Sequence, residues 1–162
     1  MNMQIRNNTG TPTRLSPSQQ MRLQLDICQS QFDLWRGELR ALPECPKPGA
    51  SSCAGLDSCR CSETVDGILA GAVEFMNEHF TRENTLMRRG VGMRGLRELF
   101  ELHAEDHGMI MSSLVKAMEL PTPCRQRRAL TTLFDQHLQR HFVTHDSLLR
   151  EELPRLHYRA QA

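Results

Sequence analysis

The sequence is poor in aromatic residues, in net charge and in long apolar runs, and each scarcity excludes a class of protein. Its 162 residues include one Trp, one Tyr and six Phe, and 20 Lys+Arg against 19 Asp+Glu leave a formal net charge of +1. Nucleic-acid binders need a concentrated basic face, so we expect no nucleic-acid partner. No run reaches the roughly 18 apolar residues of a membrane span, so we expect none.

The N-terminal residues also lack the apolar segment of a secretory signal. We therefore expect a cytoplasmic protein whose thiols stay reduced. What the chain does have is seven histidines, six cysteines and nine methionines. Imidazoles and thiolates are common metal ligands, so this composition points to metal chemistry.

Four segments carry apolar residues at alternating spacings of three and four, the pattern of amphipathic helices. They cover residues 17–42, 62–90, 96–120 and 124–152. Ser16 and Thr122 are placed to cap the first and fourth helices, and Pro43 ends the first. We predict an all-α fold, an antiparallel up-down four-helix bundle over residues 16–152 with a metal site in its core. Residues 1–15 are expected to form a flexible arm, and residues 153–162 a tail.

Three pairs of ligand-type residues lie on the apolar faces of the last three helices. His79 and Glu83 are four residues apart, as are His103 and His107, so each pair shares one face. His141 and Asp146 are five apart, about 140° around an α-helix. Any one pair alone is compatible with a solvated surface. Together, buried among apolar side chains, they would cost several kcal/mol unless paired or bound to metal.

These three motifs, in this order, resemble the signature of the hemerythrin and bacteriohemerythrin family of HHE cation-binding domains. The resemblance implies two non-heme iron ions joined by an oxo or hydroxo group. It implies that His103, His107 and His141 hold one iron and His79 the other, with Glu83 and Asp146 bridging. It also implies that O2 binds at an open position on the second iron. Leu138 and Phe142 would line the gas pocket by the same resemblance, although both positions equally suit the bundle core.

The sequence departs from this family at one ligand, a histidine expected on the first helix after an Asp-x-x. Alignment on Asp26 places Gln29 there, whereas the apolar periodicity points Cys28 into the core. Either the second iron keeps an open or water-filled position, or Gln29, Cys28 or His137 fills it. His137 qualifies because it lies one turn before His141. For Cys28, the simpler interpretation is a small buried apolar side chain.

A cysteine-rich loop is expected between the first two helices, as an insertion over residues 43–61. It contains Cys45, Cys53, Cys59 and Cys61 at spacings of eight, six and two. Four thiolates could hold zinc or an iron–sulfur cluster, but this spacing lacks paired CxxC motifs. The alternative is a loop with incidental or reactive thiols.

The leading functional hypothesis is a di-iron protein that binds or senses O2, with NO or redox state as related signals, and not a conventional enzyme. One alternative is a di-iron redox enzyme that reduces peroxide, O2 or NO. Another is a regulatory metal-binding module that docks a partner. Because the chain has no room for an output domain, signalling would require a separate signalling or redox partner protein.

Overall fold

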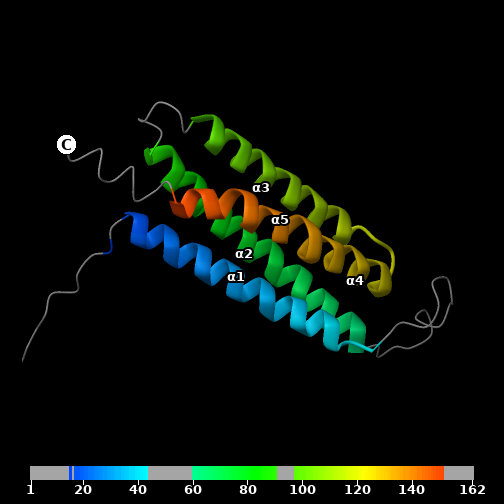
Figure 1. The fold of residues 1–162 in the computed structure, drawn as a ribbon. Helices are drawn as coiled ribbons and strands as arrows, with labels where there is room; N and C mark the ends of the chain where they lie inside the picture. Colours follow the sequence, from blue (N-terminus) through cyan, green and yellow to red (C-terminus); the bar gives the residue numbers. More distant parts are fainter. Residues whose placement is uncertain (1–14, 16, 44–59, 91–96, 152–162) are drawn as a thin grey trace, which may run out of the picture.

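The computed structural model describes residues 15, 17–43, 60–90 and 97–151, and every regular element among them is helical. Helix α1 covers Pro17–Ala41, α2 covers Arg60–Gly90 and α3 covers Arg97–Met118. A final helical segment begins with α4 (Pro123–Thr132) and continues through η2 (Leu133–Leu138), α5 (Gln139–His141) and η3 (Phe142–Asp146). The helices pack side by side as a bundle (Figure 1). The predicted arm apart from Leu15, the C-terminal tail and Cys45, Cys53 and Cys59 lie outside the described residues.

The helix boundaries follow from local sequence. Thr122 caps α4, where its Oγ1 accepts a hydrogen bond from the backbone N–H of Arg125, and Pro123 occupies the first turn, where it removes no helical hydrogen bond. Helix α1 ends at Ala41, two residues before Pro43. None of the described helices is long and apolar enough to cross a membrane.

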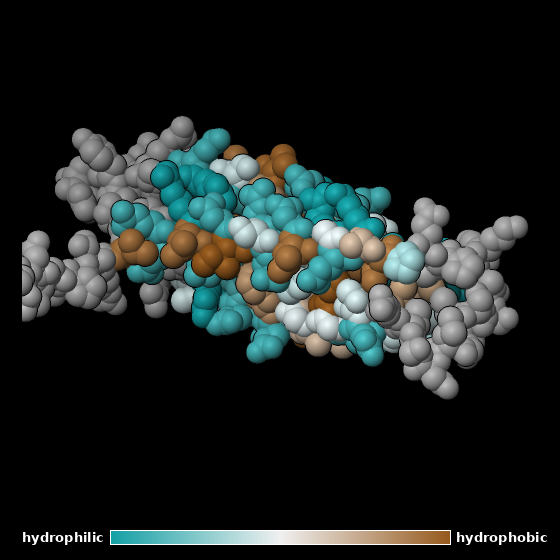
Figure 2. All heavy atoms as spheres, turned by 90° about the horizontal axis from the view of Figure 1, so that it is seen from below, coloured by the Kyte–Doolittle hydropathy of each residue, from teal (hydrophilic) through white to brown (hydrophobic). Residues whose placement is uncertain are grey.

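The periodicity of α1 correctly predicts which of its residues are buried. The buried stripe consists of Met21, Leu25, Cys28, Phe32, Trp35 and Leu39. The opposite face exposes Leu23, Ile27 and Leu34. Viewed from below, the molecule shows a row of apolar side chains among hydrophilic ones (Figure 2).

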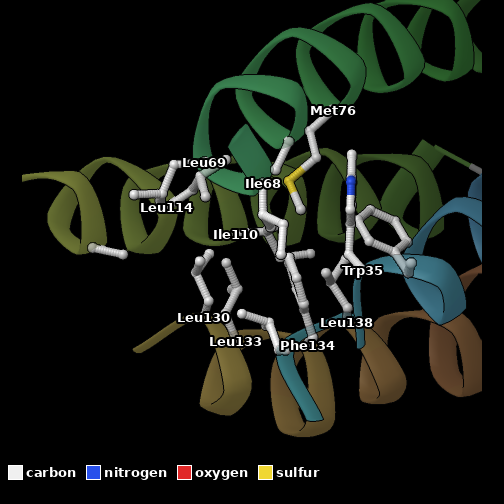
Figure 3. Close-up of a cluster of buried hydrophobic side chains, with 14 of the residues drawn as sticks. Trp35, Ile68, Leu69, Met76, Ile110, Leu114, Leu130, Leu133, Phe134 and Leu138 are labelled. Carbon is white, nitrogen blue, oxygen red and sulfur yellow. The ribbon is translucent and has the colours of Figure 1, made fainter. Parts of the chain in front are cut away.

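The apolar core is divided into two clusters. The larger one contains Trp35, Ile68, Leu114 and Phe134, together with further apolar side chains from the packed helices (Figure 3). The smaller one consists of Met21, Leu25, Met87, Phe100 and Leu149. Along each of the last three helical segments, the residues of one cluster are followed by those of the other. The predicted ligand residues lie where the change from one cluster to the other occurs. On α1 the same boundary falls between Leu25 and Cys28, so Cys28 is the α1 residue at this level.

The fourth helical segment is not one continuous α-helix, which corrects the sequence-based expectation. Two stretches, η2 and η3, are π-helical, and in η3 the backbone N–H of Ser147 donates to the carbonyl of Phe142 five residues back. A π turn brings residues five apart onto nearly one face, whereas an α-helix separates them. The η3 turn therefore gives His141 and Asp146 a common inward direction, and both are buried.

Candidate metal centre

The structure brings the six predicted ligand residues into one buried cluster. One ring nitrogen from each of His103, His107 and His141 and one carboxylate oxygen of Glu83 lie within 4.8 Å of one another. His79, Glu83 and Asp146 are also buried. Helices α2 and α3 supply two residues each at i,i+4 spacing, and the last helical segment supplies His141 from α5 and Asp146 from η3.

Glu83 faces two different sets of imidazoles with its two oxygens. Oε1 lies 3.3 Å from His79 Nε2. Oε2 lies 3.1 Å from His107 Nε2 and 3.7 Å from His103 Nε2. This division of oxygens is the arrangement needed by a carboxylate that bridges two cations.

Asp146 closes the cluster from the last helical segment. Its Oδ1 lies 3.1 Å from His141 Nε2 and 3.5 Å from His103 Nε2. The three Nε2 atoms of His103, His107 and His141 thus lie near two carboxylate oxygens, one from Glu83 and one from Asp146. Three imidazoles with two carboxylates form a nitrogen and oxygen donor set that suits iron, manganese or zinc.

Many polar atoms of the cluster have no hydrogen-bond partner within the described part of the chain. Among the described residues, every buried side-chain nitrogen or oxygen without a hydrogen-bond partner belongs to the six clustered residues or to the neighbouring His145. The short N···O distances bring charges together, but the atoms do not point toward each other as donors and acceptors. Because an unsatisfied buried polar group costs about 1–3 kcal/mol, a bound cation fits this site.

The charges in the cluster shift its pKa values in opposite directions. Burial raises the pKa of Glu83, but the imidazoles of His103, His107 and His79 outweigh it, so the pKa lies well below its usual value. Burial lowers the pKa of His107 to about 4, despite the opposing carboxylate of Glu83. Burial also disfavours protonation of His141, but Asp106 and Asp146 outweigh it and raise its pKa to about 9. The cluster thus holds an ionised carboxylate, neutral His107 and a His141 from which a bound metal must displace a proton.

Sequence reasoning missed two residues behind the imidazoles. Asp106 Oδ2 accepts a hydrogen bond from His141 Nδ1 at 2.7 Å, and Asn84 Oδ1 lies 3.3 Å from His107 Nδ1. Asp106 is three residues after His103 and four before Ile110, on the same helix face, so its spacing alone could have indicated burial. Asn84 carries no such signal.

Aromatic rings hold the imidazoles from the apolar side. The ring of Phe80 is stacked on His107 with centroids 3.8 Å apart, and Phe75 is stacked on His79 at 5.8 Å. Phe80 is almost completely buried. An apolar ring therefore covers one face of the His107 imidazole and one face of the His79 imidazole.

The proposed substitutes for the missing histidine occupy very different places. Gln29 is exposed on α1, and the structure does not bring it to the cluster. His137 is half-buried and takes no part in the ion pairs or ring contacts of the clustered histidines. Cys28 is buried, and its thiol pKa is raised strongly, first by burial and then by the nearby charges of Glu83 and Asp146.

The remaining predicted residues lie near the cluster or away from it. Leu138 is fully buried in the larger apolar cluster. Phe142 is half-buried, with its ring centroid 6.2 Å from that of His141. Cys61, predicted to lie in the loop over residues 43–61, is instead buried in the first turn of α2, because the helix begins at Arg60. A cysteine metal site in the loop stays a prediction, because its other three cysteines lie outside the described residues.

No protein-family model, curated protein or solved structure matches the chain. The resemblance to hemerythrins therefore stays a prediction from the sequence motifs.

Proposed function

We propose that this chain is a hemerythrin-like protein that holds two iron ions and binds or senses O2, within an antiparallel up-down four-helix bundle. The observation that carries the proposal is the position of Glu83. Its Oε1 faces His79 while its Oε2 faces His107 and His103, so the carboxylate lies between two separate groups of nitrogen donors. A single-metal site would not need its carboxylate divided in this way.

The first metal position is defined by the three imidazoles of His103, His107 and His141. The second position is defined by His79. Glu83 would bridge the two positions, because its two oxygens face different groups of imidazoles. Asp146, whose Oδ1 lies 3.1 Å from His141 Nε2, is assigned as the second bridge by the resemblance to hemerythrins. These residues would hold a pair of ferrous ions, which would supply the electrons for reversible O2 binding.

The two positions differ in the number of protein ligands, and this difference supports gas binding at the second. His79 is the only imidazole at that position among the described residues, because α1 contributes Cys28 at this level in place of a histidine. A metal with few protein ligands keeps coordination positions for an external molecule. The apolar side chains of Phe75 and Phe80 beside His79 limit the entry of water.

The first experiment is metal analysis of the protein expressed in iron-rich medium, followed by a visible spectrum. We expect two iron ions per chain. We also expect a charge-transfer band that appears when the anaerobically reduced protein meets O2 and disappears on deoxygenation. Permanent oxidation without a reversible band would favour the redox-enzyme alternative, and one zinc ion with no iron would reject both.

The variant His79→Ala tests the division of the site into two positions. It removes the imidazole of the second position and leaves the three imidazoles of the first. We expect it to retain about half of the wild-type iron and to lose the reversible band. Unchanged iron content would contradict the assignment of His79 to a metal.

A further inference from the structure

Two imidazoles of the first metal position have side-chain acceptors behind them, and these acceptors differ in charge. His107 Nδ1 lies 3.3 Å from the neutral amide oxygen of Asn84. His141 Nδ1 donates to the Asp106 carboxylate over a much shorter distance of 2.7 Å. The third imidazole, His103, has no partner for Nδ1 among the described residues.

Asp106 is a buried residue that bridges two helical segments. It lies on α3 directly before His107, only 3% exposed, while its partner His141 lies on the last helical segment. Its other oxygen, Oδ1, lies 3.4 Å from Arg140 Nη2, and His145 Nε2 lies 3.9 Å from Oδ2. The carboxylate is therefore fixed from three sides.

A hydrogen bond at Nδ1 decides what the other ring nitrogen can do. When Nδ1–H is held by an acceptor, Nε2 carries the lone pair and the ring cannot rotate away from the metal. A carboxylate acceptor also makes the imidazole a stronger donor than a neutral amide does. His141 and His107 thus differ in donor strength although both are histidines.

We propose that Asp106 is a positioning residue that aims His141 Nε2 at the first metal and strengthens that bond through its negative charge. Asn84 aims His107 in the same way without a charge. This inference rests on the proposed metal site, and it adds a residue outside the predicted ligand set. The consequence is an asymmetric first position, in which His141 is the strongest of the three imidazole donors.

The test measures the affinity of the metal-free protein for Co²⁺, by competition with a chromophoric chelator. Asp106→Asn keeps the shape of the side chain and removes its charge, and we expect a loss of about 10-fold or more in affinity. Asn84→Ala, which removes a neutral acceptor, is expected to lose less. The Co²⁺ absorption bands should shift in Asp106→Asn, because the ligand field of His141 weakens. Equal affinity and equal spectra for wild type and Asp106→Asn would overturn the proposal.

A charge-relocation variant separates this role from a merely structural one. Asn84→Asp combined with Asp106→Asn moves the carboxylate from His141 to His107. We expect the double variant to recover a substantial part of the affinity lost in Asp106→Asn, and no recovery would overturn the role of the charge. Failure of wild type to bind Co²⁺ would instead reject the proposed metal site, so the two failures are distinguishable.

Discussion

The ring of Phe80 lies almost flat on the imidazole of His107, with centroids 3.8 Å apart and an angle of 12° between the planes. Phe80 follows His79 directly in α2, so one short segment supplies both the imidazole of the proposed second metal position and a support for His107 of the proposed first position. The apolar ring prevents His107 from turning out of the cluster. The packing of the core and the geometry of the site are therefore coupled at this contact.

Phe80→Ala should strongly destabilise the protein. Phe80 is only 4% exposed, and removal of a buried phenylalanine ring costs about 3–5 kcal/mol in the free energy of unfolding. Phe80→Leu should cost less, because it leaves a smaller cavity. Urea unfolding of the metal-free protein measures both, and equal stabilities of Phe80→Ala and wild type would contradict the packing described for this ring.

Removal of a ligand should abolish metal binding, whereas removal of a nearby histidine should not. We expect His103→Ala to reduce bound iron to a small fraction of the wild-type content. His137→Ala is the matched control, because His137 is half-buried on the last helical segment but lies outside the cluster. Loss of iron in His137→Ala would identify this residue as the substitute ligand.

The stability of the metal-free protein should depend on pH from both sides of neutrality. His107 has a folded-state pKa of about 4, so its unfolded form binds more protons between pH 4 and about 6.5, and stability falls as the pH drops through this range. His141 has a raised folded-state pKa of about 9, so its contribution is full below about pH 6.5 and is lost as the pH rises through 9.

Thermal unfolding of the metal-free protein between pH 4 and pH 10 measures this dependence, with a maximum expected near pH 6.5. In the proposed site, bound metal would occupy His141 Nε2 in place of the proton. The decline on the alkaline side should therefore be reduced in the loaded protein. Identical alkaline profiles for the two forms would contradict binding at His141.

A histidine at position 28 should add a ligand to the second metal position, whereas a histidine at position 29 should not. Cys28 is 1% exposed and senses the charges of Glu83 and Asp146, while Gln29 is exposed. Cys28→His is expected to change the visible spectrum of the iron-loaded protein and to slow its oxidation in air. Gln29→His should behave as wild type, and the reverse outcome would place Gln29 at the metal.

Deletion of the exposed Thr144 should be tolerated, because it removes the extra residue of the η3 turn. His141 and Asp146 would then be separated by four positions in an α-helix and still share one face. We expect the Co²⁺ affinity to remain within about 10-fold of wild type. Deletion of the exposed Ser112 is the control, because it lies in the regular helix α3 and would rotate Leu114 and Ala117 out of the core. Equal damage from both deletions would contradict this account of η3.

Those parts of the structure that depend on local spacing were predictable from the sequence. The buried stripe of α1, the cap at Thr122 and the shared faces of His79 with Glu83 and of His103 with His107 all follow from a period of 3.6 residues. Convergence of these pairs from separate helices was a hypothesis, and the structure brings them together.

What depends on contacts between helices was not predictable. The π turn at η3 is not encoded by any one residue type, so an α-helix was expected between His141 and Asp146. The contact of Asp106 with His141 joins residues 35 positions apart. At Cys28 and Gln29 two sequence arguments disagreed, and the exposure of Gln29 agrees with the apolar periodicity.

The layer of polar and charged side chains between the two apolar clusters has a consequence for how fast the protein is degraded. Among the described residues the smaller cluster has five buried members, and the layer beside it contains buried polar atoms that have no hydrogen-bond partner. A metal that binds the folded state and not the unfolded state lowers the population of locally unfolded molecules. Chains without metal should therefore unfold locally at the end of the bundle that holds the smaller cluster, and proteases should cleave them faster. The amount of folded protein in a cell would then follow its metal supply.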